Sequence, residues 1–186
     1  SQQATAVETS AGSLAAELVV LSTGAEAPRF AKLLGCRIPI QPGKGYSLTM
    51  SPLRNPPRVP MIFEEHHVAV TPLESAFRVG STMEFTGYDR SLKRKRLALL
   101  RRSAEEHLTE PLPADITEEW TGWRPMVYDG IPCIDRAPAA KNVIVAAGNG
   151  MIGLATAPAT GTLVAEVASN TAPHLDPAPY SLARFS

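Results

Sequence analysis

The chain has 186 residues, of which 44% are apolar, 19% charged and 6% aromatic. This length suits one domain or one and a half, and the apolar share supports a real core, so wholesale disorder is excluded. Eighteen basic and eighteen acidic side chains give a net charge of zero, which argues against nucleic acid as a partner. The two cysteines, Cys36 and Cys133, lie far apart and predict buried thiols in a reducing compartment.

Seventeen prolines, about 9% of the residues against a usual ~5%, predict short strands and loops with few long helices. No signal peptide is evident. The stretch 142–169 is too interrupted by Pro158, Glu166 and glycines to span a membrane, a role that needs ~20 mostly apolar residues. Attachment to a membrane surface stays open.

The chain opens with a predicted hairpin, whose turn at residues 10–12 leads into a strand that ends at Leu21. Because residues 18–21 are all apolar, we expect this strand to be covered on both faces. A short helical turn follows and is closed by Gly35. Strands with antiparallel pairing are then expected at residues 45–50, 61–63, 67–71 and 77–82.

Residues 91–107 form the clearest predicted helix, with one apolar stripe made by Leu92, Leu97, Leu100, Ala104 and Leu108. Its basic cluster, residues 93–96, is typical of a solvated helix face more than of a nucleic-acid or lipid patch. Further strands are expected at 116–124 and, fully buried, at 142–147. A last helix is expected over about 158–169, with Thr156 just before it and Pro158 near its first position.

Residues 148–153 read Gly-Asn-Gly-Met-Ile-Gly, a GxGxxG between a predicted strand and a predicted helix. Such glycines allow a tight turn and close approach of a phosphate to a helix N-terminus. No acidic residue ends a second strand ~20 residues later, as the dinucleotide fingerprint requires. Contact with a cofactor and an ordinary helix-entry loop are therefore equally compatible with this pattern, and pyrophosphate binding is disfavoured.

Arg124 follows the only two tryptophans, Trp120 and Trp123, at the end of a predicted strand. A guanidinium binds carboxylates through two hydrogen bonds, and an apolar aromatic setting strengthens that pair. Stacking on tryptophan or an internal ion pair is the structural alternative. His66 and His67 point to opposite faces of a strand and lack further ligands at suitable spacing, so we predict no metal site.

Taken together, five segments resemble the C-terminal part of the flavin-dependent D-amino-acid oxidase/dehydrogenase family, with the bacterial D-amino-acid dehydrogenases as the best match. They are residues 18–25, 41–47, 122–126, 129–134 and 142–161, in the order that the family has them. Two positions depart from the family: Glu26 stands near a position that is often aromatic, and Asn149 stands where histidine is common.

The resemblance implies FAD as the cofactor and assigns the candidate site residues. Thr23, Gly24 and Ala25 would approach the FAD, and Gly148, Asn149, Gly150, Met151, Ile152, Gly153 and Leu154 would lie against its isoalloxazine. Arg124 would pair with the substrate carboxylate. Tyr46 and Lys44 would fall in a loop that reaches toward the active site.

The implied fold is α+β, with parts of an α/β flavin-binding layer and an antiparallel-sheet substrate domain with packed helices. We expect residues 1–35 to belong to the flavin-binding layer and residues 36–138 to form the substrate domain. Residues 139–186 would return to the layer as a strand, the flavin-facing loop and a helix.

The implied activity is oxidative deamination of D-amino acids, in which a hydride passes from the substrate Cα to flavin N5 and leaves an imino acid. The family's N-terminal ADP-binding unit is not found among these 186 residues. We therefore expect a partner segment on the same or a separate chain, and no activity from these residues alone. The alternatives are a non-catalytic recognition or assembly module and a glycine- or sarcosine-oxidase-like enzyme. We expect a cytoplasmic protein; peripheral attachment at the inner membrane with a quinone as electron acceptor stays open.

Overall fold

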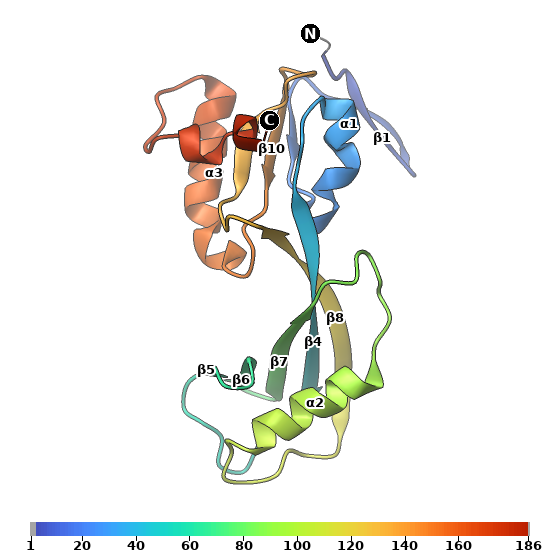
Figure 1. Ribbon diagram of the computed structural model, residues 1–186, viewed down its shortest axis with the longest axis vertical. Helices are drawn as coiled ribbons and strands as arrows, with labels where there is room; N and C mark the ends of the chain where they lie inside the picture. Colours follow the sequence, from blue (N-terminus) through green and yellow to red (C-terminus); the bar gives the residue numbers. More distant parts are fainter. Residues whose placement is uncertain (1–2, 186) are drawn as a thin grey trace. The chain divides into compact units, whose positions relative to one another are not determined.

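The computed structural model describes residues 3–185, and the chain folds into two compact units (Figure 1). The first unit combines residues 1–42 and 124–186, and the second is residues 43–123. The chain passes between them within two strands, β4 (Ile40–Met50) and β8 (Ile116–Val127). The expected middle segment of residues 36–138 extends beyond the second unit at both ends. Part of the reason is that β9 (Cys133–Arg136) pairs with a strand of the first unit.

The first unit contains a three-stranded sheet in the order β3-β10-β9. β10 (Val143–Ala147) pairs in parallel with β3 (Val19–Leu21) and antiparallel with β9. Figure 1 shows α1 (Ala31–Leu34) and α3 (Gly153–Ser169) on opposite sides of this sheet. A 3₁₀ helix, η1 (Gly24–Phe30), links β3 to α1, and Gly35 ends α1 in the left-handed region at φ 66°. Two further 3₁₀ helices, η2 (Ala178–Tyr180) and η3 (Leu182–Phe185), form the tail.

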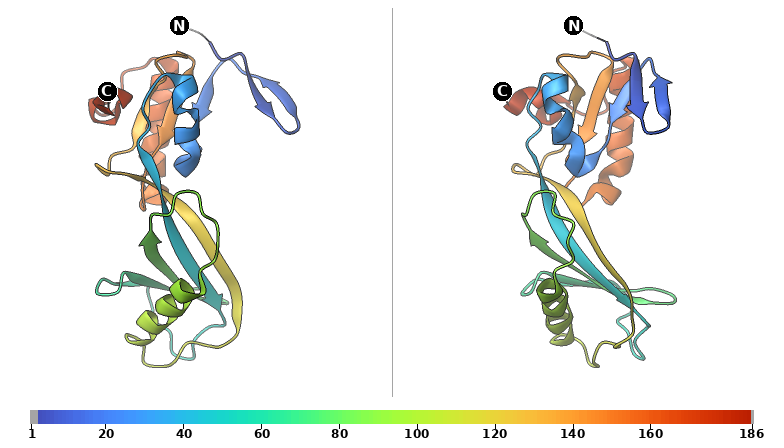
Figure 2. Two further views of the ribbon diagram at one scale, coloured as in Figure 1. Left: turned by 45° about the vertical axis from the view of Figure 1, so that its right-hand side comes forward. Right: turned by 90° about the vertical axis from the view of Figure 1, so that its right-hand side faces the viewer.

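The prediction that the strand ending at Leu21 is covered on both faces was wrong. Leu21 is buried, but Leu18 and Val20 are exposed. Within residues 3–185, β3 lies at the edge of its sheet and pairs only with β10, so no described strand pairs with its other side. The predicted hairpin is present as β1 (Ala6–Thr9) and β2 (Gly12–Ala15), and it projects from the unit (Figure 2).

The final helix was predicted to begin near residue 158, but α3 begins five residues earlier. Pro158 therefore lies inside the helix, where its missing N–H leaves the carbonyl four residues earlier without its usual donor. Thr156 was expected to cap the helix. It lies instead in the first turns, and its hydroxyl donates to the carbonyl of Ile152 at 3.2 Å.

The second unit is built on a five-stranded sheet in the order β5-β6-β7-β4-β8. β5 (Met61–Phe63), β6 (Val68–Pro72) and β7 (Phe77–Glu84) form an antiparallel meander, and β7 pairs antiparallel with β4. The predicted antiparallel pairing is confirmed. α2 (Arg94–Glu105) packs against β6 and β7 and closes the core.

The apolar stripe of α2 faces this core as predicted for Leu97, Leu100 and Ala104, whereas Leu92 is exposed ahead of the helix. The basic cluster of residues 93–96 is largely used within the unit. Lys93 and Arg96 pair with Glu84, and Arg94 pairs with Glu119. These pairs favour the interpretation of a solvated helix face.

No helix within residues 3–185 combines the length and the apolar character needed to cross a bilayer.

Replacing Leu100 with alanine should destabilise the second unit by about 2–5 kcal/mol, because its side chain is 0% exposed and truncation leaves a cavity. Leu33→Ala is the matched control: Leu33 is 75% exposed, so its free energy of unfolding should change by less than about 0.5 kcal/mol. Equilibrium urea unfolding followed by circular dichroism measures both. Equal losses in the two variants would contradict the assigned core.

Candidate functional site

Two of the predicted cofactor-binding segments begin at the same end of the first unit's sheet. β3 and β10 run parallel, with Leu21 opposite Val145. The segments that follow them, residues 23–25 and 148–154, therefore start side by side at the carboxyl ends of the strands. In open α/β sheets, ligands bind outside the carboxyl ends of the strands.

The loop of residues 148–154 has a shape that requires glycine. Gly148 and Gly150 have φ values of 97° and 58°, in the left-handed region. A Cβ on Gly148 would lie 2.7 Å from Cγ2 of Val127, so a side chain there would collide with β8. The amide of Gly150 donates to the carbonyl of Pro125 at 3.1 Å. The loop is thus tied to the residue that follows Arg124.

The segment after β3 is open where a ligand would approach it. Gly24 has a φ of 57°, and nothing lies within 4 Å of the position that its Cβ would occupy. The amide of Glu26 donates to the carbonyl of Thr23 at 3.1 Å, which closes the turn, and Ala25 is buried beneath it. The backbone of Gly24 therefore faces open space.

The glycine loop presents an apolar surface at the start of a long helix. Met151, Ile152 and Leu154 are all exposed, Leu154 at 93%. α3 has no side-chain cap at its N-terminus and no acidic residue in its first turn. The N–H groups of that turn carry a partial positive charge that no residue of the turn neutralises. A flat apolar group with a negative edge would suit this surface.

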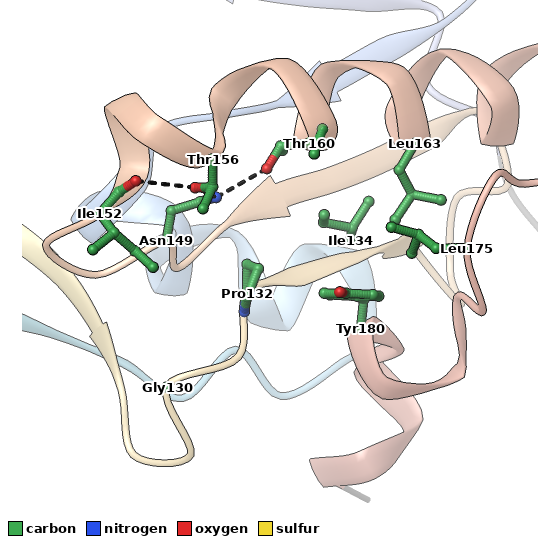
Figure 3. Close-up of a pocket in the computed structure, with 11 residues that line it drawn as sticks. Gly130, Pro132, Ile134, Asn149, Ile152, Thr156, Thr160, Leu163, Leu175 and Tyr180 are labelled. Carbon is green, nitrogen blue, oxygen red and sulfur yellow. Dashed lines mark hydrogen bonds between the residues drawn. The ribbon is translucent and has the colours of Figure 1, made fainter.

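Behind the loop lies a cavity of about 150 Å³ (Figure 3). Apolar side chains from β9, α3 and the tail line most of it, including Ile134, Leu163 and Leu175. At its polar end the amide of Asn149 donates to the hydroxyls of Thr156 and Thr160, both at 2.9 Å. Asn149 therefore fixes the loop to α3 from within.

Arg124 is partly buried, and this burial lowers the pKa of its guanidinium. An arginine keeps its charge even so, and partial burial strengthens its attraction for an anion. Both tryptophans contact residues of the second unit. Trp120 covers Gly122, whose missing Cβ leaves room for the indole. Trp123 lies under the guanidinium of Arg90, 4.6 Å from the ring centroid.

Lys44 and Tyr46 belong to the second unit and are buried there. Lys44 is 0% exposed, and its Nζ donates to Asp89 at 2.9 Å and to the carbonyl of Ser91 at 2.5 Å. The hydroxyl of Tyr46 donates to Glu84 at 2.8 Å. Their polar atoms are engaged inside the unit, so the arrangement fits residues that hold a site in shape.

Four alternating charges close a ring in this unit, which we call the ion-pair ring: Lys44, Glu84, Asp89 and Lys93. The N–O distances in order around the ring are 3.8 Å for Lys44–Glu84, 2.9 Å for Glu84–Lys93, 3.9 Å for Lys93–Asp89 and 2.9 Å for Asp89–Lys44. Sequence reasoning found only Lys44. The spacing of Asp89 and Ser91, typical of a side-chain turn, was the available signal for Asp89.

The ring shifts the pKa values of its members. Burial opposes the charge of Glu84, but hydrogen bonds from Lys93 and Tyr46 outweigh it and lower the pKa of the carboxyl. Hydrogen bonds from Ser91 and Lys44 hold the pKa of Asp89 far below its usual range. Burial opposes the charge of Lys44 as well, yet its bond to Asp89 raises the pKa of the ammonium.

His66 pairs with a histidine that is distant in sequence. Its Nδ1 lies 3.0 Å from Nε2 of His107, and its Nε2 lies 3.3 Å from Glu106. His67 occupies the left-handed region at φ 51°. Over residues 3–185, no three histidine, cysteine or acidic side chains are grouped so that they could hold a metal ion.

Comparison with known proteins places the chain in a family. The family model described as FAD dependent oxidoreductase (DAO) matches residues 1–167. The chain belongs to this family. It is 36% identical to a D-amino acid dehydrogenase of Xanthobacter autotrophicus, over 98% of this chain and 44% of that protein. It is 34% identical to an uncharacterized oxidoreductase of Halorhodospira halophila, over 96% of this chain and 83% of that protein.

Among solved structures, glycine oxidase from Geobacillus kaustophilus matches with a TM-score of 0.84 and 26% identity, over 96% of this chain and 48% of that one. The α+β fold predicted from the sequence is confirmed. The chain spans less than half the length of the dehydrogenase and of the glycine oxidase that it matches.

FAD, the cofactor of this family, fits the residues that follow the carboxyl ends of β3 and β10. The open backbone at Gly24, the exposed apolar loop and the uncompensated helix N-terminus suit a planar ring system that carries negative charge when reduced. Thr23, Gly24, Ala25 and the loop of residues 148–154 are the residues that would hold it.

Replacing Gly148 with alanine should destabilise the first unit by about 2–4 kcal/mol, since the new Cβ must adopt a left-handed φ and displace Val127. Gly161→Ala is the matched control within α3. Nothing lies within 4 Å of its Cβ position, so it should stabilise the helix by about 0.5–1 kcal/mol. Urea unfolding of both variants gives the signs. A stable Gly148→Ala variant would overturn the assigned loop geometry.

The ion-pair ring predicts a pH dependence of stability. Glu84 and Asp89 have lowered pKa values when folded, so their contribution is present above the unfolded values of 4.5 and 3.8 and is lost as pH falls below them. Lys44 has a raised pKa, so its contribution is lost only as pH rises above 10.5. In urea titrations between pH 2 and pH 7, Asp89→Asn should flatten the acid limb. Glu8→Gln on the exposed hairpin is the control, and an equal effect there would contradict the prediction.

Proposed function

We propose that this chain forms the substrate-binding and flavin-facing part of an FAD-dependent dehydrogenase or oxidase of D-amino acids. One observation carries the proposal. The amide of Gly150 in the glycine loop donates a hydrogen bond to the carbonyl of Pro125, the residue directly after Arg124. The proposed carboxylate-binding cation and the proposed flavin-binding surface therefore belong to one unit. The similarity to D-amino acid dehydrogenases supports this choice of substrate.

In this proposal Arg124 binds the substrate carboxylate through two charge-assisted hydrogen bonds and fixes the orientation of Cα. FAD, when bound, would supply the oxidising chemistry that converts the amino acid to an imino acid. The amides at the start of α3 favour negative charge at the loop. Substrate enters with a neutral amine, so no side-chain base is needed.

Lys44 and Tyr46 keep the second unit in shape in this proposal. Both are buried, and both bond to carboxylates of their own unit. They belong to β4, one of the two strands through which the chain passes from one unit to the other.

A further segment, on the same chain or a separate one, completes the flavin site in this proposal. The chain covers 44% of the dehydrogenase it resembles, and the edge strand β3 exposes Leu18 and Val20. An added strand would pair with that edge and cover these side chains. On this view, residues 1–186 by themselves are colourless and inactive, whereas the completed protein is yellow from bound oxidised flavin.

A glycine-oxidase-like enzyme is the second candidate, favoured by the structural match to glycine oxidase. A panel of D-alanine, D-phenylalanine, glycine and sarcosine separates the two by relative kcat/KM. Assays of the same panel with oxygen and with a soluble quinone identify the electron acceptor.

Replacing Arg124 with alanine in the flavin-loaded protein should raise the KM for a D-amino acid by roughly 100-fold, since the loss of a charge-assisted pair costs about 2–3 kcal/mol. Flavin content, measured by absorbance, should be unchanged. Arg102→Ala, an exposed arginine of α2, is the control and should leave KM unaltered. An unchanged KM in Arg124→Ala would remove Arg124 from the proposed role.

A further inference from the structure

Glu84 is the most connected member of the ion-pair ring. Its two oxygens accept hydrogen bonds from Tyr46 at 2.8 Å, Lys93 at 2.9 Å and Arg96 at 3.1 Å. The residue is 9% exposed. Without this carboxylate, three cations, Lys44, Lys93 and Arg96, would share Asp89 as the remaining carboxylate of the group, and the ring would be left with excess positive charge.

The backbone of β7 is distorted at the point that brings Glu84 into the ring. Tyr46 pairs with Ser81 and Lys44 with Glu84, so β7 places one extra residue opposite β4. Ser81 and Thr82 have φ values of 112° and 52°. A positive φ is costly for a β-branched residue such as threonine, and distortions of this kind persist where the surrounding structure fixes them. β-bulges commonly re-aim a side chain, here the carboxylate of Glu84.

The ion-pair ring is linked by a hydrogen bond to Trp123, the residue that precedes Arg124. The side chain of Asp89 accepts from Lys44 and from the amide and hydroxyl of Ser91, each at 2.9 Å. The backbone carbonyl of Asp89 accepts a hydrogen bond from Nε1 of Trp123 at 3.2 Å. Tyr88 and Arg90, its neighbours in the chain, pack on the same indole. The loop that the ring holds therefore fixes Trp123 on three sides.

We propose that Glu84 is a positioning residue for the carboxylate-binding arginine and acts through the ring and Trp123. The inference rests on the proposed role of Arg124. The charged ring holds the Tyr88–Arg90 loop against the indole, and the indole holds β8 in place immediately before Arg124. Neutralising Glu84 removes the nearer of the two carboxylates that hold Lys93 and loosens this loop. The backbone of Arg124, which follows Trp123 directly, then loses this anchor while the charge of the guanidinium is untouched.

Glu84→Gln in the flavin-loaded protein tests the proposal. The expected result is a KM for the D-amino acid raised about tenfold, with kcat within twofold of the parent and flavin content unchanged. Glu84→Asp keeps the charge on a shorter stem and should raise KM less than threefold. Glu119→Gln is the matched control, because Glu119 also pairs with an arginine of α2 but lies outside the ring. It should leave KM unchanged.

A second measurement needs no activity. Within residues 1–186, a Trp120→Phe background leaves Trp123 as the only tryptophan, so the fluorescence of this chain reports the surroundings of Trp123 directly. Glu84→Gln should shift this emission to longer wavelength and increase its quenching by acrylamide, and Glu119→Gln should change neither. Unchanged emission in Glu84→Gln would overturn the coupling of the ring to Trp123.

The two proposals fail differently. If Arg124→Ala raises KM but a folded Glu84→Gln variant does not, Glu84 is a structural residue only and the positioning proposal is overturned. A lowered melting temperature with KM unchanged has the same meaning. If Arg124→Ala leaves KM unchanged, the proposed function fails, and a shift of Trp123 emission would still establish the link from Glu84 to the indole. Should Glu84→Gln not fold, Glu84→Asp carries the same tests with the smaller KM change.

Discussion

The parallel pairing of β3 with β10 is the constraint on which the proposed flavin site of this chain depends. Gly24 and Gly148 are more than a hundred positions apart in the sequence. They nevertheless follow the strands at the same end of the sheet, because the two strands run in the same direction. An antiparallel pair would have put these glycine segments at opposite ends. The pairing is held by a core in which Leu21, Val143 and Val145 are buried, so the stability of the first unit and the placement of its site have the same origin.

The second unit meets a different demand, the burial of charge. A lysine with no exposed surface is costly unless opposite charges and hydrogen bonds replace the water it has lost. Lys44 satisfies this condition with Asp89 and a carbonyl, and Glu84 satisfies it with Tyr46 and two cations at the start of α2, Lys93 and Arg96. Removing Glu84 or Lys44 would leave the other with one opposite charge fewer in a buried position. Such a network therefore stabilises a single arrangement of β4, β7 and the start of α2.

Local patterns in the sequence predicted much of this fold. The strands of the meander, the stripe of α2 and the turn at Gly35 were predicted because each depends on neighbours in the chain. The exposure of Val20 was missed, since it depends on which strands flank β3 and not on its own apolar run. The ion-pair ring was missed for the same reason, because Glu84 contacts Lys44 only through the register of β7 on β4. That register includes a bulge that no residue type in the sequence predicts. Resemblance supplied the remaining site residues; their roles stay proposals.

Asn149 illustrates how a departure from the family pattern can be explained by local geometry. Its amide nitrogen carries two hydrogens that diverge from one atom, and Thr156 and Thr160 lie one helical turn apart on the face of α3 that meets the loop. One amide thus reaches both hydroxyls. The two ring nitrogens of a histidine point away from opposite sides of the ring, so a histidine here could bond one of the threonines but not both. Asparagine at this position therefore couples the glycine loop to α3 through both hydroxyls, and Thr156 and Thr160 complete that coupling.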